Sequence, residues 1–175
     1  MITWTEFERR QPALADAGRR QFYRFGIGLA FLATVRSDGG PRVHPVCPVV
    51  SPAGLHLVIK AGPKQQDLRR DGRYALHSEA CPPPRHDDGF AIIGRAREVT
   101  GSQAAGLVRR QVLAERGGQV WPGFDDEAIF ELGIERCLLT LTEADGPFPA
   151  GPTIWKADGI ARPGSTAQPD IVIER

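Results

Sequence analysis

The sequence lacks the features that mark metal-binding, redox-active or membrane-spanning proteins. Its 175 residues include three cysteines, widely spaced and odd in number, and no Cys-x-x-Cys pair. This spacing argues against a zinc cluster or a redox pair. No apolar run approaches the ~20 residues that span a bilayer, and the charged N-terminal segment lacks the apolar core of a signal peptide. We therefore expect a cytoplasmic protein with neither a membrane segment nor a metal site.

An excess of charge of either sign is also missing. Lys and Arg number 22 against 21 Asp and Glu, which gives a formal net charge of +1. Without a basic tract, the composition predicts no nucleic-acid partner. Lysine itself is scarce, and the positions of Lys60, Lys64 and Lys156 are therefore informative.

What is present is the composition of a soluble β-rich domain. Short apolar runs separated by turn residues predict six antiparallel strands, at 29–36, 41–50, 55–61, 74–80, 90–100 and 134–144. Pro45 and Pro48 cannot donate ladder hydrogen bonds, so the second of these strands should be bulged or partly unpaired there. Few crossovers and short turns favour a small closed or half-closed barrel.

Helices and a tail complete the predicted domain. A helix over 3–25 should break near Pro12, and a clear helix follows at 102–117. The acids at the start of 125–133 indicate a second short helix or turn there. We predict one domain over residues 1–160 and a loosely ordered tail over 161–175, which is rich in Pro, Gly, Ser and Gln.

One predicted strand carries polar groups on a single face. Side chains alternate along a strand, so Arg42, His44 and Val46 share one face of 41–50. A strand that only fills a core has no use for such a face. The pattern therefore indicates the wall of a ligand site.

The loop after the third strand is a second candidate. The sequence "IKAGPKQQDLRR" leads through Gly62 and Pro63 into a helix that starts near Lys64. Helix N-termini favour phosphate, and a lysine in the first turn adds a point charge. Strand pairing should bring Arg42, Lys60 and Lys64 to one end of the barrel. Three converging cations are costly unless they meet an anion, so we expect an anionic ligand.

Two segments together carry a family resemblance. Residues 31–78, which include "LATVRSDGGPRVHPV" and "DLRRDGRYAL", are followed by "FAIIGRAREV" at 90–99. They resemble the pyridoxamine 5′-phosphate oxidase-like superfamily, the FMN-binding split barrels. The resemblance implies a mainly β fold with flanking helices, a six-stranded antiparallel split β-barrel that forms a homodimer. It also implies a flavin-dependent oxidoreductase that acts on a small organic substrate.

The resemblance implies a set of cofactor-binding residues but no catalytic side chain. Arg42 and Lys64 would hold the FMN phosphate. Two strand segments would flank the rest of the cofactor, namely Val43, His44, Pro45, Val46, Ile59, Lys60 and Ala61. His77 on the fourth strand can approach the ring edge, and Trp155 is the candidate side chain from the partner subunit.

The sequence departs from the family at the phosphate site. Many members place serine or arginine where this chain has Gly62 and Pro63. The reduced clamp leaves open a deazaflavin coenzyme, whose longer anionic tail Arg69 and Arg70 could meet. It also leaves open a non-catalytic protein that binds a flavin, or haem through an axial histidine. The substrate-phosphate residues of true pyridoxamine 5′-phosphate oxidases are not recognisable, so synthesis of pyridoxal phosphate is not expected.

Overall fold

The N-terminal region forms two helices in sequence. The computed structural model describes residues 1–79, 88–142, 151–157 and 172–173. Helix α1 (Trp4–Arg10) begins where the Thr3 hydroxyl accepts a hydrogen bond from the Glu6 amide at 3.2 Å. Helix α2 (Pro12–Phe22) starts on Pro12, whose missing N–H is not needed at a first helical position. The predicted break near Pro12 is confirmed.

The rest of the described chain is mostly strand. The strands are β1 (Ala30–Val35), β2 (Pro41–Val46), β3 (Pro48–Ser51), β4 (Gly54–Ile59), β5 (Arg73–Ser78), β6 (Gly89–Glu98), β7 (Ala128–Thr140), β8 (Thr153–Lys156) and β9 (Val172–Ile173). Between them lie α3 (Pro63–Arg70), α4 (Ser102–Glu115) and the short 3₁₀ turn η1 (Phe124–Asp126). The predicted tail at 161–175 lies outside the described residues except for β9.

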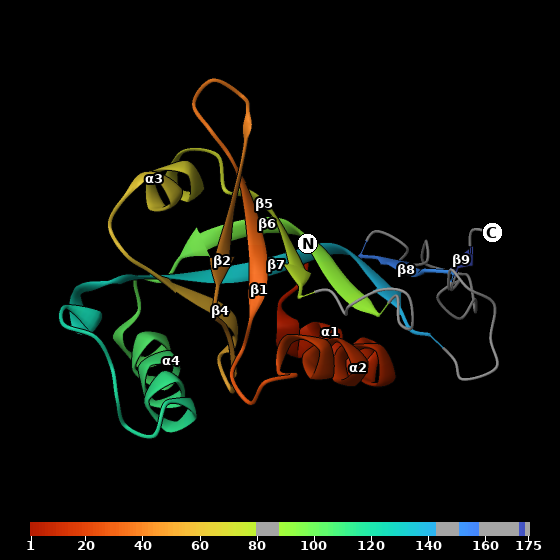
Figure 1. Ribbon diagram of the computed structural model, residues 1–175, viewed down its shortest axis with the longest axis horizontal. Helices are drawn as coiled ribbons and strands as arrows, with labels where there is room; N and C mark the ends of the chain where they lie inside the picture. The colour runs from red at the N-terminus through yellow and green to blue at the C-terminus, as the bar shows by residue number, and fades with distance from the viewer. Residues whose placement is uncertain (80–87, 143–150, 158–171, 174–175) are drawn as a thin grey trace.

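All strand pairs of the described residues are antiparallel, and the strand order brings the two ends of the sheet toward each other. The order is β2-β1-β5-β6-β7-β4-β3, with β8 added beside β7 and β9 beside β8. The two ends of this order, β2 and β3, are separated along the chain only by Cys47. One continuous segment therefore pairs with β1 on one side and with β4 on the other, which curls the sheet into a half-barrel (Figure 1).

The expected count of six strands is wrong, because the main path has seven. The predicted strand 41–50 is two strands, β2 and β3, with Cys47 between them. Pro45 and Pro48 flank the break, and neither has an amide hydrogen for the ladder. The irregularity predicted at these prolines is the corner at which the segment changes neighbours.

The short helix or turn predicted over 125–133 is also corrected. Only η1 is helical, and β7 already begins at Ala128. Phe130 and Leu132 face the main core, while Ile129 packs under α4. A strand buried on both faces loses the alternation that marks strands in a sequence.

Two cores fill the molecule, and the residues that the structure describes leave one sheet face uncovered around Phe31, Val43 and Ile93. The larger core joins the inner sheet face to α1 and α2 through a row of rings in the order Phe7, Trp4, Phe90 and Phe22, whose neighbouring centroids lie 5.3–6.4 Å apart. A smaller core lies under α4 around Val108, Val112 and Phe124. Figure 1 shows α3 and α4 on opposite sides of the left part of the sheet and α1 and α2 below its centre.

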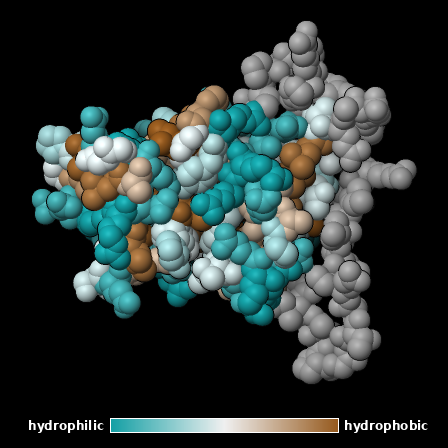
Figure 2. Space-filling view, turned by 90° about the horizontal axis from the view of Figure 1, so that it is seen from below, coloured by the Kyte–Doolittle hydropathy of each residue, from teal (hydrophilic) through white to brown (hydrophobic). Residues whose placement is uncertain are grey.

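The surface differs between the two ends of the molecule. Seen from below, the outward side of α1 and α2 is largely hydrophilic, and hydrophobic side chains gather toward the end that carries α4 (Figure 2). Among the described residues, no helix is long and apolar enough to cross a membrane.

Candidate cofactor site

A buried carboxylate organises the predicted anion site. Asp67 on α3 is only 4% exposed and accepts hydrogen bonds from Arg42 Nε at 2.7 Å, Thr34 Oγ1 at 3.0 Å and Arg70 Nη1 at 3.3 Å. Thr34 and Arg42 face each other across β1 and β2. Burial raises the pKa of Asp67, but the hydrogen bonds from Arg42, Thr34 and Arg70 outweigh burial and hold this pKa below its usual range.

One carboxylate does not neutralise the cations around it. Arg42 donates only its Nε–H to Asp67. Within the described ranges its two terminal amino groups make no hydrogen bond. Arg70 bonds Asp67 and the Val35 carbonyl. Lys64 lies three residues before Asp67 on the same face of α3 and has no ion-pair partner in the described part of the chain. Arg42, Lys64, Asp67 and Arg70, which we call the phosphate cluster, therefore carry excess positive charge.

Lys64 is partly withdrawn from solvent. Burial lowers its pKa, and the nearby Cys47 and Glu127 act in the opposite direction. A half-buried ammonium group without an ion-pair partner gains more from a bound anion than an exposed one does, because water screens it less.

The first turn of α3 is open to a ligand. Gly62 precedes the helix at a φ of 155°, no side chain caps this end, and Pro63 occupies the first position. The Gln65 side chain instead donates to the Ile59 carbonyl at 3.2 Å and so ties the helix start to the end of β4. Uncapped amides at a helix start favour an anion, in keeping with Lys64 in the same turn.

The structure gathers some of the predicted site residues and separates others. Arg42 reaches Asp67 on α3, and Lys64 precedes Asp67 by three residues on that helix, while Lys60 and Ala61 are exposed on the chain that leads into it. Ile59 and Val46 are buried at strand ends, while Val43, His44 and Pro45 are exposed on β2. The wall of polar groups predicted on this strand is thus reduced to Arg42, which is turned toward Asp67.

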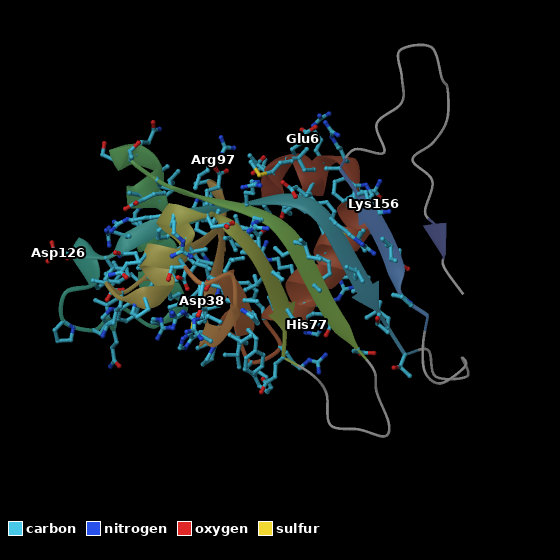
Figure 3. The ribbon with its side chains drawn as sticks, turned by 90° about the horizontal axis from the view of Figure 1, so that it is seen from above. Glu6, Asp38, His77, Arg97, Asp126 and Lys156 are labelled. Carbon is cyan, nitrogen blue, oxygen red and sulfur yellow. The ribbon has the colours of Figure 1, made fainter. Side chains whose placement is uncertain are left out.

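His77 and Trp155 lie apart from the cluster. His77 is exposed near the end of β5, where its Nδ1 lies 2.6 Å from the Ser78 carbonyl oxygen. Figure 3 shows His77 well separated from α3, the helix that carries Asp67. Trp155 is 6% exposed, with its ring centroid 5.1 Å from that of Phe7. The side chain expected to reach a partner's cofactor is therefore part of this chain's own core.

Comparison with known proteins identifies the fold. No model of a protein family matches the sequence, and no curated protein matches it. Among solved structures, a putative pyridoxamine 5′-phosphate oxidase from Listeria innocua aligns over 71% of this chain and 95% of its own, at 14% identity and a TM-score of 0.54. The chain therefore shares the split-barrel fold of that structure.

Other split barrels that resemble the chain bind different cofactors. A FAD-binding protein from Mesorhizobium loti aligns over 62% of this chain and 82% of its own, at 22% identity and a TM-score of 0.50. A haem-binding protein from Mycobacterium smegmatis aligns over 81% of this chain at 15% identity and a TM-score of 0.57, and this chain spans 58% of its length. At these identities the likeness is one of fold.

Sequence reasoning missed the central residue of this split barrel. It expected cations without a balancing acid, whereas Asp67 binds two of them. The available signal was the helical spacing of Lys64, Asp67 and Arg70, which places all three on one face. Burial of Asp67 against Thr34 depends on how α3 packs on β1, and no local pattern reveals that contact.

Proposed function

We propose that the chain binds FMN at the phosphate cluster and acts as a flavin-dependent oxidoreductase on a small organic substrate. The observation that carries the proposal is the excess of three cations, Arg42, Lys64 and Arg70, over the one carboxylate that binds two of them. A phosphate monoester brings up to two negative charges, which match that excess. The likeness to a putative oxidase and to a FAD-binding protein of the same fold supports it.

In this proposal the chain's own residues bind the cofactor and orient it. The terminal amino groups of Arg42 face the phosphate while Asp67 fixes the side chain through Nε. Lys64 adds a point charge, and Lys60 favours a reduced, anionic ring. The exposed β2 segment and the end of β4 flank the rest of the cofactor. Bound flavin supplies the electron or hydride chemistry.

A pair of lysine variants tests the phosphate site. We expect Lys64→Met to weaken FMN binding at least about tenfold, because one charge-assisted contact to phosphate is lost. Lys156→Met removes an exposed lysine on β8, far along the molecule from α3 (Figure 3), and should leave affinity unchanged. Quenching of FMN fluorescence during titration measures both. Equal affinities in the two variants, or a wild-type protein that retains no FMN, would contradict the proposal.

We also propose that two copies pair through the uncovered sheet face. Strand register places apolar residues in one row across four strands, Val43, Ala33, Ala75 and Ile93. Val43 is 60% exposed and Ile93 is 39% exposed, and Phe31 in the adjoining row is 44% exposed. An apolar face of this extent beside the end strand β2 is typical of an interface between subunits.

Haem binding without turnover is the second candidate. It is favoured by the exposure of His44 and His77 and by the likeness to a haem-binding protein. A titration with haemin decides it, because a Soret shift that His44→Ala or His77→Ala abolishes would identify an axial ligand. The deazaflavin alternative is less favoured, because Arg69, one of the two arginines expected to meet its longer tail, already bonds Glu98 at 2.6 and 2.7 Å.

A further inference from the structure

A cavity lies where the corner between β2 and β3 faces the end of α4. Its volume is about 180 Å³, and its walls include Val46, Cys47, Val58, Arg116 and Trp121. Most of these groups are apolar. An apolar cavity of about 150 Å³ in a protein takes up one benzene molecule, so this volume suits a single six-membered ring with one small substituent.

The polar side of the cavity carries two charged side chains, Glu115 and Arg116, that are engaged differently. Glu115 lines it, but its Oε1 already accepts hydrogen bonds from Tyr23 at 2.8 Å and Gln111 at 3.0 Å. Arg116, at the end of α4, forms no ion pair within the ranges that the structure describes. A half-buried guanidinium on an otherwise apolar wall is matched by a carboxylate, which it can bind through two parallel hydrogen bonds.

Trp121 gives the cavity a fixed aromatic wall. Its Nε1–H donates to Glu127, and its ring meets Phe124 edge-on with centroids 5.0 Å apart. The Arg116 guanidinium carbon lies 5.2 Å from the Trp121 ring centroid. These contacts hold the aromatic face and the cation next to each other before any ligand arrives, which lowers the entropy cost of binding.

Part of the cavity wall comes from the segment expected to flank the cofactor. Pro45 and Val46, from the strand expected to flank the cofactor, line it. Cys47 on its wall and Glu127, the partner of Trp121, both lie close enough to Lys64 to act on the pKa of that lysine. A molecule in the cavity would thus lie beside a cofactor held by Lys64.

We infer that this cavity is the substrate subsite, and that it takes a small molecule with one flat ring and one carboxylate. The ring packs against Trp121 and Val58, and the carboxylate meets Arg116. Its role as a substrate subsite rests on the proposed flavin-dependent function, whereas binding of a ring carboxylate does not.

Benzoate and its neutral counterpart benzamide test the inference on the full chain without added flavin. The chain has three tryptophans, so its ¹H–¹⁵N spectrum shows three indole signals, and the spectrum of Trp121→Phe assigns one of them. We expect benzoate to shift the Trp121 indole signal and to bind at least about tenfold more tightly than benzamide, because only benzoate offers a charge to Arg116.

Two arginine variants, one within α4 and one at its C-terminal end, test the role of the Arg116 charge. Arg116→Met keeps the aliphatic stem and should weaken benzoate binding at least about tenfold. Arg110→Met, an exposed residue of α4 away from the cavity, should bind benzoate like the wild type. An unmoved Trp121 signal, or equal benzoate affinity in Arg116→Met and wild type, overturns the inference. If Arg116→Met does not fold, equal wild-type affinities for benzoate and benzamide overturn it instead.

The failure of this inference is separable from failure of the proposed function. A protein that binds FMN but not benzoate refutes the ring-carboxylate subsite alone. A protein that binds benzoate at Trp121 but no FMN refutes the flavin function and, with it, the role of the cavity as a substrate subsite.

Discussion

At the scale of single residues, Asp67 decides the shape of the phosphate cluster. It joins three elements, because its partners come from β1, β2 and its own helix α3. By holding Arg42 through Nε, it directs the remaining amino groups of that side chain. Asp67 is thus a positioning residue, and its effect should be measurable without any cofactor.

Asp67→Asn tests this role at neutral pH. The change keeps the shape of the side chain but removes the charge that Arg42 and Arg70 contact, so we expect unfolding to become easier by about 2–3 kcal/mol. Urea denaturation measures the difference. Asp38→Asn is the matched control, because Asp38 is exposed and pairs with Arg36 at 3.1 Å, and it should change stability by less than about 0.5 kcal/mol. Similar losses in both variants would contradict the role assigned to Asp67.

The lowered pKa of Asp67 also predicts how stability depends on pH. A carboxyl whose pKa is lower in the folded state stabilises fully above its unfolded value, here 3.8, and loses that contribution as pH falls through its folded value. The wild type should therefore lose more stability than Asp67→Asn on acidification from about pH 5 to about pH 2. A gap between the two unfolding free energies that stays constant over this range would exclude the charge as the cause.

At the scale of elements, the sequence predicted the helix and strand features that depend only on residues within one segment. The break at Pro12, the long helix at 102–117 and the irregularity at Pro45 and Pro48 follow from proline geometry and helix periodicity. The start of β7 and the division of 41–50 into two strands depend instead on which neighbours a segment meets in the fold. No pattern within the segment encodes those neighbours.

The pairing of β6 with β7 depends on a glycine. The register shifts at Gly94, where a Cβ atom would lie 1.9 Å from the Gly133 carbonyl oxygen. Gly94→Ala must separate the two strands, so we expect a loss of about 2 kcal/mol or more in thermal unfolding. Gly106→Ala is the control, because its new Cβ meets nothing closer than 3.5 Å within helix α4 and should stabilise by about 0.5–1 kcal/mol. Equal effects of the two changes would argue against close strand contact at Gly94.

At the scale of the whole molecule, the proposed cofactor site lies beside β2, at one end of the strand order. The exposed β2 residues that should flank a flavin belong to the same uncovered region as Val43, Phe31 and Ile93. Pairing of two chains there would cover the apolar row and enclose the cofactor from a second side. The sequence predicted Val43 as a residue that flanks the cofactor but predicted no residue of a dimer interface on this sheet face, and the strand register places Val43 in one surface with Phe31 and Ile93.

Val43→Glu tests that pairing. A charge within an apolar interface is costly to bury, so sedimentation velocity should show a dimer for the wild type and a monomer for the variant. Val120→Glu places the same charge on another exposed valine, 40% exposed in the segment after α4, and should leave the dimer intact. A wild-type monomer at micromolar concentration, or a dimer that survives Val43→Glu, would contradict pairing through this face.

The pairing of β4 with the distant strand β7 has a consequence for the synthesis of the chain. Strand β4 can pair with β3 as soon as both are synthesised, since a tight turn joins them. Its other neighbour, β7, is synthesised much later, because Ile59 pairs with Ala128. At a synthesis rate of about 5–20 residues per second, the intervening stretch takes on the order of ten seconds to emerge from the ribosome. Throughout that interval β4 offers an open edge beside Leu55 and Leu57, both fully buried once folding ends. The nascent chain is thus most exposed to misassociation just before β7 appears, and slow translation between these strands would lengthen that period.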